Sequence, residues 1–166
     1  MFIVNVIGFD LVWFGLVYWG NSFIPIALIL LGLHFCFISK FKTKELQLVC
    51  IVALIGIAVD STLQVFDVFI FESDTTLPFW LITLWACFAA TLCHSLNFLQ
   101  KSKILQWLIG ALLAPLSYIA GNKLQAVSFS LTTESTFIIL SLIWGLLMII
   151  FFSLKHHLID RENAYA

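Results

Sequence analysis

The sequence predicts an all-α integral membrane protein, a six-helix transmembrane bundle with the N-terminus and the C-terminus in the cytoplasm. Of the 166 residues, 62% are hydrophobic and 10% are charged, a composition far from that of soluble domains. The hydrophobic residues fall into six runs, and a helix of about 20 such residues crosses a bilayer. The basic residues lie between these runs in an asymmetric pattern that predicts the orientation.

This asymmetry is nearly complete. Seven of the eight basic residues follow every second run: Lys40, Lys42, Lys44, Lys101, Lys103, Lys155 and Arg161. Only Lys123 lies on the opposite side. Cytoplasmic loops of membrane proteins retain Lys and Arg. The second, fourth and sixth runs are therefore expected to end in the cytoplasm, which places both termini there.

The ends of the spans carry local signals. A minimal turn, Gly20-Asn21-Ser22, joins the first two spans, and Pro25 lies in the first turn of the second, where its missing N–H costs no bond. The acidic segment 72–76 predicts an outer loop, and Pro78 opens the fourth span. The predicted spans make residues 1–166 a single transmembrane domain and cover about residues 2–19, 23–38, 46–69, 79–99, 104–120 and 137–154.

Two alternatives to this topology stay open. The first two runs can merge into a bent hairpin that does not cross the bilayer, although this would move Lys40 and Lys44 outside, against the charge asymmetry. Residues 123–129 can also dip back into the membrane as a re-entrant piece.

Polar residues of the third span predict a pocket in the outer half of the membrane. Asp60 and Gln64 are four positions apart and Asp67 is three further on, so one helix face carries all three. The fifth span ends at a similar depth, which suggests an Asp60–Lys123 pair. Such a pair either lines a binding pocket or locks the two helices together. The candidate outer pocket comprises Asp60, Gln64, Asp67, Tyr118, Asn122 and Lys123.

A second polar group is expected in the inner half. An Asp–His contact there would tune a proton acceptor near neutral pH, whereas the alternative is a set of interhelical hydrogen bonds. The candidate inner cluster comprises Asn5, Asp10, His34, His94 and Asn97.

The cysteines and histidines of this region do not predict a metal site. Positions 34 and 36 are about 200° apart around a helix, and positions 93 and 94 about 100° apart. Neither pair can chelate from one helix face, and no Cys-x-x-Cys or His-x-x-x-His motif is present. We therefore predict neither a metal nor a cofactor.

Small residues follow the fourth and fifth spans at helical spacing. The fifth span has Gly110, Ala114, Ser117 and Gly121, and Thr91 belongs to a similar stripe on the fourth. Because such stripes let helices approach closely, we expect the two spans to pack together. Pro115 should bend the fifth span, and such a bend can shape a cavity.

Two segments carry a family resemblance. Residues 78–96 read PFWLITLWACFAATLCHSL, and residues 110–121 read GALLAPLSYIAG. With Asn5, Trp13 and Asp60-Ser61, they resemble a bacterial inner-membrane family named only domain of unknown function 2878. The family pattern has Gly near Asp67, near Gln125 and at the position of Ala114, where this chain departs from it.

This resemblance implies an inner-membrane protein of Gram-negative bacteria without an assigned activity. It also implies a link to lipid metabolism, because some members are encoded beside methyltransferases that resemble cyclopropane fatty-acid synthases. The expected partners are membrane lipids and, at the membrane surface, a lipid-modifying enzyme; no basic patch points to nucleic acid.

Three functions follow as alternatives, and the sequence does not decide whether the protein is an enzyme. The first is binding or modification of a lipid acyl chain, which predicts an apolar slot that opens laterally beside a polar cluster. The second is a non-catalytic scaffold for a partner enzyme, which predicts no internal cavity. The third is a small proton-coupled transporter, which predicts water-accessible volume that reaches Asp60 from outside or Asp10 from inside.

Overall fold

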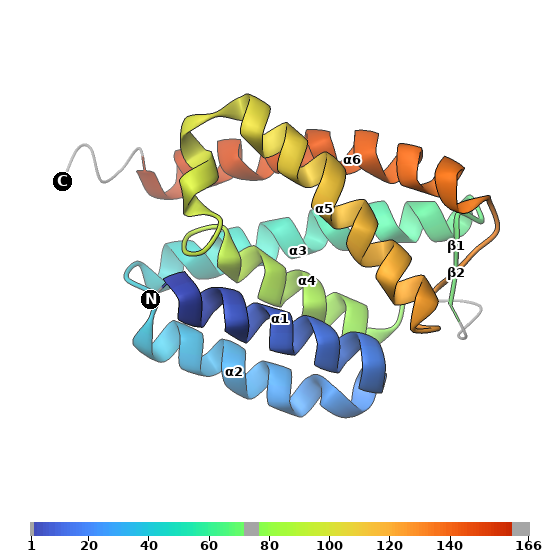
Figure 1. Cartoon of the computed structure of the whole chain (residues 1–166). Coiled ribbons are helices and arrows are strands. Elements are labelled where there is room, and N and C mark those ends of the chain that lie inside the picture. The colour runs from blue at the N-terminus through green and yellow to red at the C-terminus, as the bar shows by residue number, and fades with distance from the viewer. Residues whose placement is uncertain (1, 72–76, 161–166) are drawn as a thin grey trace.

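The computed structural model describes residues 2–71 and 77–160 and is helical apart from one short ladder. Figure 1 shows the helices in chain order: α1 (Phe2–Trp19), α2 (Ile24–Phe37), α3 (Lys42–Val65), α4 (Phe79–Thr91), α5 (Lys103–Lys123) and α6 (Thr133–Lys155). Shorter elements are the 3-10 turns η1 (Gly20–Phe23) and η2 (Asn97–Lys101), the strands β1 (Phe69–Ile70) and β2 (Ser128–Phe129), and a π-helical turn, η3 (His156–Asp160). The acidic segment 72–76 and Arg161, on which part of the topology prediction rests, lie outside the described residues.

Four stretches of the described chain are long and apolar enough to cross a membrane: Phe2–Phe37, Lys42–Val65, Lys103–Lys123 and Thr133–Ile159. The first of them contains both α1 and α2, which η1 folds back on each other; α4 is apolar but shorter. The predicted class, an all-helical multi-pass membrane protein, agrees with these stretches. The number of crossings and the orientation stay predictions.

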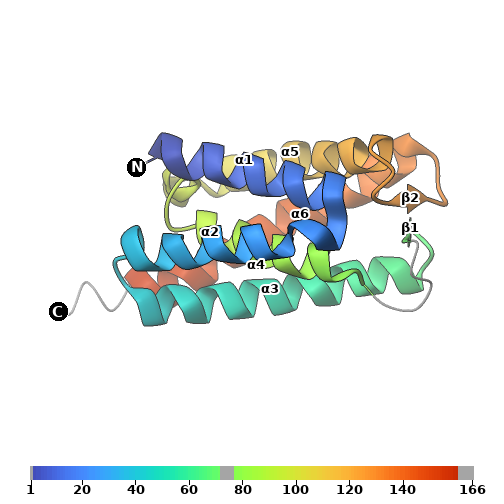
Figure 2. The same ribbon diagram turned by 90° about the horizontal axis from the view of Figure 1, so that it is seen from below.

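Successive helices run in opposite directions between two ends of the bundle (Figures 1 and 2). The start of α1, the end of α6, the α2–α3 connection and the α4–α5 connection lie at one end, and the α1–α2 turn and the two strands lie at the other. Within the bundle α4 packs against α1, α2 and α3, while α5 packs chiefly against α6.

The third helix begins and ends four residues earlier than predicted, at Lys42 and Val65. Its buried side chains recur every three or four positions: Glu45, Leu48, Val49, Val52, Gly56, Asp60 and Leu63. A Cβ atom at Gly56 would lie 2.1 Å from the Trp85 ring, so the glycine lets this indole rest against the α3 backbone.

The fourth helix ends at Thr91 rather than near Leu99. After Thr91 the chain turns, with the Leu96 amide bonded to the Thr91 carbonyl at 3.0 Å. The Ser95 amide donates to the side chain of Asn5 on α1 at 3.1 Å. This turn, and not a helix, carries His94.

Helices α3 and α5 end in the same way. At the end of α3 the Val68 amide bonds to the Leu63 carbonyl and the Asp67 amide to the Gln64 carbonyl, and Ala126 and Gln125 repeat this pattern after α5. This is the Schellman arrangement, whose central residue takes a left-handed conformation that favours glycine. Asp67 and Gln125 accordingly have φ values of 55° and 63°.

The two caps lead directly into the antiparallel ladder in which Phe69 pairs with Phe129 and Ile70 with Ser128. Residues 124–129 thus leave α5 through a tight turn and join β2 to β1. The re-entrant position of residues 123–129 in the membrane stays a prediction.

Candidate functional site

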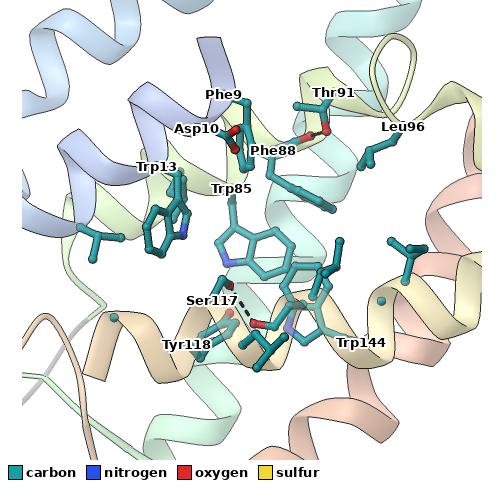
Figure 3. Close-up of a pocket in the computed structure, with 18 of the residues that line it drawn as sticks. Phe9, Asp10, Trp13, Trp85, Phe88, Thr91, Leu96, Ser117, Tyr118 and Trp144 are labelled. Carbon is teal, nitrogen blue, oxygen red and sulfur yellow. Dashed lines mark hydrogen bonds between the residues drawn. The ribbon is translucent and has the colours of Figure 1, made fainter. Parts of the chain in front are cut away.

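A cavity of about 620 Å³ lies among α1, α4, α5 and α6 (Figure 3). Most of its wall is aromatic or aliphatic, and its volume falls in the range of small-molecule sites. The aromatic lining includes Phe9, Trp13, Trp80, Trp85, Phe88 and Trp144, and the polar lining comprises Asp10, Thr91, Ser95, Ser117 and Tyr118.

The cavity reaches the outer surface of the bundle between α1 and α5. Its lining includes Phe2 of α1, which is 53% exposed, and Leu113 and Leu116 of α5, which are 57% and 52% exposed. Figures 1 and 2 place α1 and α5 on the same side of the molecule, with α4 and α6 behind the gap between them. The side chains at this opening are thus exposed and apolar, apart from the exposed Asp10 of α1.

The small-residue stripes of α4 and α5 do not form the close helix–helix contact predicted for them. Thr91 on α4 and Ala114, Ser117 and Gly121 on α5 line the cavity instead. Gly110 serves a different contact, because a Cβ there would lie 2.5 Å from the Trp144 carbonyl oxygen on α6. The small side chains of α5 leave space for the cavity on that helix, whereas α4 faces it mainly with large side chains such as Trp85 and Phe88.

Stacked indoles form the deepest part of the wall. The rings of Trp85 and Trp144 are parallel to within 5° with centroids 4.9 Å apart, and Phe88 meets both edge-on. Offset stacks and edge contacts of this kind stabilise aromatic clusters beyond the area they bury. In Figure 3 Trp85, Tyr118 and Trp144 converge at this point.

Asp60, which is not part of the cavity wall, forms hydrogen bonds with Trp85 and Tyr118. Its carboxylate is fully buried and accepts hydrogen bonds from Trp85 Nε1 at 2.7 Å and from the Tyr118 hydroxyl at 2.9 and 3.1 Å. The prediction of an Asp60–Lys123 pair is wrong: Lys123 is exposed at the end of α5, and among the described residues the partners of Asp60 are Trp85 and Tyr118. Asp60 thus joins α3 to α4 and α5 through neutral donors.

The other residues of the predicted outer pocket do not gather around Asp60. Gln64 is half-buried, and Asn122 donates its side-chain N–H to the Val127 carbonyl at 2.9 Å. The exposed Asp67 accepts a hydrogen bond from the Ser130 hydroxyl through its backbone carbonyl. The structure brings Asp60 and Tyr118 together and leaves the remaining four residues in the capped helix ends.

The predicted inner cluster forms in part, with a carboxylate that the sequence argument did not consider. His94 Nε2 lies 3.0 Å from Glu45 Oε2, and the rings of His34 and His94 meet edge-on with centroids 4.6 Å apart. Asn5 Nδ2 lies 3.5 Å from His34 Nδ1. Asn5, His34 and His94 therefore do lie together, and Glu45 provides the acid.

Asp10 and Asn97, the other two members of the predicted inner cluster, lie elsewhere. Asp10 is exposed on α1 and lines the cavity, and Asn97 accepts a hydrogen bond from Lys155 Nζ at 2.5 Å. The predicted Asp–His contact is thus a Glu–His contact, between Glu45 and His94.

Comparison with protein families identifies the chain. The model for a family described as "Protein of unknown function (DUF2878)" matches residues 2–150, nearly the whole length. The chain belongs to this family. No similar curated protein and no similar solved structure is found.

The segments on which the DUF2878 resemblance rests converge on the cavity. Residues 78–96 contribute Trp80, Trp85 and Thr91 to its wall, and residues 110–121 contribute Ser117 and Tyr118. Trp13 also lines the cavity, Asp60 anchors Trp85 and Tyr118, and Asn5 fixes the turn at Ser95.

Glu45 is not among the predicted site residues, because it lies between the predicted second and third spans, in the same stretch as Lys40, Lys42 and Lys44. Its spacing gave a usable signal: Glu45 precedes Leu48, Val49 and Val52 by three, four and seven positions, which puts it on the buried face of α3. An acidic residue in the first turn of a helix is also electrostatically favoured.

Proposed function

We propose that this protein binds the acyl chain of a membrane lipid in the cavity between α1 and α5, as a multi-pass protein of a bacterial inner membrane with both termini in the cytoplasm. The observation that carries the proposal is a mainly apolar cavity that opens toward the lipid-facing surface and has a few polar groups in its wall. This is the lateral slot that an acyl-chain site predicts. Lys42, Lys103 and Lys155, at ends of α3, α5 and α6 that lie together, support the orientation.

Affinity for an acyl chain inside a membrane needs a source other than the hydrophobic effect, since lipid tails are as apolar as the cavity. Packing supplies one source: a chain in the slot gains dispersion contacts with the indoles of Trp13, Trp80 and Trp85, which an empty cavity lacks. Polar groups supply the other, because Asp10 and Ser117 offer hydrogen bonds to an ester or head group that lipid tails cannot satisfy.

The geometry favours this function over the two alternatives. A scaffold does not require an internal cavity. A proton-coupled carrier would need water-accessible volume at Asp60 or at Asp10. Asp60 is fully buried behind Trp85 and Tyr118 and is not part of the cavity wall, which counts against a carrier that uses Asp60. Asp10 does line the cavity, so a carrier that uses Asp10 is separated from lipid binding by the test alone. The two alternatives become outcomes of the test below.

The test is photolabelling in nanodiscs that contain a phosphatidylethanolamine with a diazirine on one acyl chain. Ala114→Phe fills the cavity from α5, and Ala58→Phe makes the same change at an exposed position of α3 outside it. We expect label on the α4 residues of the cavity wall, Trp85 and Phe88, in the wild type and in Ala58→Phe, and its loss from these residues in Ala114→Phe. The exposed faces of α1 and α5 should be labelled in all three proteins, because they contact bulk lipid. Equal labelling of the α4 residues in the wild type and Ala114→Phe would contradict the proposal.

A second measurement separates binding from modification. The acyl-chain profile of membranes is compared between cells with the gene, cells without it, and cells restored with Ala114→Phe. A profile that changes on deletion and is not rescued by the variant supports a role in lipid modification. An unchanged profile with positive photolabelling supports binding alone, and the absence of both effects favours the scaffold or the carrier.

A further inference from the structure

We infer that His34, Glu45 and His94 form a site for one divalent transition-metal ion. The three residues come from the last turn of α2, the first turn of α3 and the turn that follows α4. One ligand atom from each residue lies within 4.8 Å of the other two. The site is separate from the lipid cavity, and the inference does not rest on the proposed function.

The spacing of the three side chains fits a metal site before the ion is bound. Zn²⁺ bonds to His nitrogen and carboxylate oxygen at about 2.0–2.2 Å, which places tetrahedral ligand atoms about 3.4 Å apart. The separation of 3.0 Å between His94 Nε2 and Glu45 Oε2 is already close to this value. The remaining separations between ligand atoms are at most 4.8 Å, about 1.4 Å more than this value. Small side-chain rotations can close that difference.

An unpartnered ring nitrogen points independently to a ligand. His34 is only 8% exposed, and its Nε2 is buried without a hydrogen-bond partner among the described residues. A buried polar atom left in this state is destabilising, and a bound ion would satisfy it. The other ring nitrogen, Nδ1, faces Asn5, so Nε2 is the atom that His34 offers to an ion.

Asn5 is placed to orient both histidines. Its Oδ1 accepts from the Ser95 amide at 3.1 Å, which fixes the turn that carries His94, and its amide nitrogen lies 3.5 Å from His34 Nδ1. Coordination through Nε2 would leave the imidazole proton on Nδ1. In this structure the Asn5 amide N–H faces Nδ1, so coordination through Nε2 requires the Asn5 side chain to turn and present its oxygen to the Nδ1 proton. Such outer partners orient metal ligands and tune affinity.

The ligand set indicates which ions bind. Two imidazoles and one carboxylate suit Zn²⁺, Fe²⁺ and Mn²⁺, and three protein ligands leave at least one position for water or another ligand. Mg²⁺ prefers an octahedron of oxygen ligands, so it should not occupy the site. The usual order of affinities places Zn²⁺ above Mn²⁺.

The prediction that no metal binds rested on chelation within a single helix. His34 and His94 indeed cannot chelate with the cysteines beside them, but the fold brings the two histidines together from different elements and adds Glu45. The ligands lie 11 and 49 positions apart along the chain, a separation at which no short motif forms.

The experiment is a metal titration of the full chain, purified in detergent and stripped with a chelator. Zn²⁺, Mn²⁺ and Mg²⁺ are added separately, with stoichiometry measured by mass spectrometry of the metal content and affinity by calorimetry. We expect one Zn²⁺ per chain, weaker Mn²⁺, no Mg²⁺ and a rise in the thermal unfolding temperature with Zn²⁺. Co²⁺ should give visible absorption bands typical of coordination by nitrogen and oxygen.

Variants assign the site. His34→Gln should lower Zn²⁺ affinity at least 100-fold, and Asn5→Ala should lower it about 10–100-fold. His157→Gln changes an exposed histidine of η3 and should leave the affinity unchanged. Failure of the folded wild type to bind stoichiometric Zn²⁺, or equal binding by the wild type and His34→Gln, would overturn the inference. Because the first of these outcomes needs no variant, a misfolded variant leaves the test decisive.

Discussion

The contact between Gly56 and Trp85 yields a quantitative prediction for Gly56→Ala. A Cβ atom at position 56 would lie 2.1–2.4 Å from three atoms of the indole, whereas ordinary contact begins at 3.4 Å. The ring must therefore retreat by about 1 Å or more, which breaks the 2.7 Å hydrogen bond from Trp85 Nε1 to Asp60. Trp85 also stacks on Trp144, so the strain reaches α6.

Three contributions set the size of the effect. Overpacking of a well-filled core costs about 1–3 kcal/mol. A hydrogen bond between helices in a membrane contributes about 0.6–1.7 kcal/mol. The higher helix propensity of alanine than of glycine offsets about 1 kcal/mol of this destabilisation. We therefore expect Gly56→Ala to lower the free energy of unfolding by about 1–4 kcal/mol.

The matched control is Gly32→Ala in α2, where an added Cβ meets nothing within 4 Å. This change should leave stability unchanged or raise it by up to about 1 kcal/mol. Unfolding by SDS in mixed micelles, followed by tryptophan fluorescence, measures both variants. If Gly56→Ala is as stable as Gly32→Ala, the packing of Trp85 against α3 is not as described, and the support of the cavity wall by Asp60 fails with it.

Three further predictions concern other contacts. Asp60→Asn should lower the free energy of unfolding by about 1–2 kcal/mol, because one of the two donors, Trp85 or Tyr118, loses its acceptor. Gln64→Leu, nearby on the same helix, should leave stability unchanged, and equal thermal stability of the two variants would count against the Asp60 contacts. Asp67→Gly and Gln125→Gly should each stabilise by about 1 kcal/mol, since both residues have positive φ, and a loss of stability in chemical unfolding would contradict the caps. Lys155→Met should lower the unfolding temperature, since its ammonium group donates to Asn97 and Gln100; an unchanged temperature would refute this contact's contribution.

The sequence predicted the helical class and approximate helix positions because long apolar runs and caps are local signals. It located Asp60 and His34 correctly as buried polar residues, since charge and hydrogen-bonding groups in an apolar run must find partners. The partners themselves depend on the fold. Tyr118 is among the residues of the predicted outer pocket, and Trp85 is not. Only the crossing of α3, α4 and α5 makes both residues hydrogen-bond donors to the Asp60 carboxylate.

The end of α4 illustrates a second limit. The apolar run continues from Phe79 to Leu99 without a proline or glycine, so periodicity gives no stop signal. The helix ends at Thr91 because tertiary contacts compete: the Ser95 amide bonds to Asn5 on α1, and the chain turns to place His94 beside Glu45. A small-residue stripe likewise does not reveal whether it brings two helices together or leaves room between them.

The family pattern, by contrast, anticipated two details of the backbone. Glycine was expected near Asp67 and Gln125, and these are the residues with positive φ other than glycine in the described chain. Each lies at the centre of a helix cap, where the left-handed conformation is obligatory and glycine takes it at least cost. The departures from the family pattern therefore change the stability of the caps and leave their geometry intact.

The buried stripe of α3 relates the two candidate sites. Glu45 and Asp60 are fifteen positions apart on the same helix face, about 22 Å along the axis, so one rigid helix holds the acidic group of each site. A second connection runs through α1 and the turn after α4. Ser95 lines the cavity, and its backbone N–H donates a hydrogen bond to the side chain of Asn5, which also faces His34. An ion that draws His34 and His94 together would therefore act on the cavity wall at Ser95, while the wall at Trp85 and Tyr118 stays fixed by Asp60.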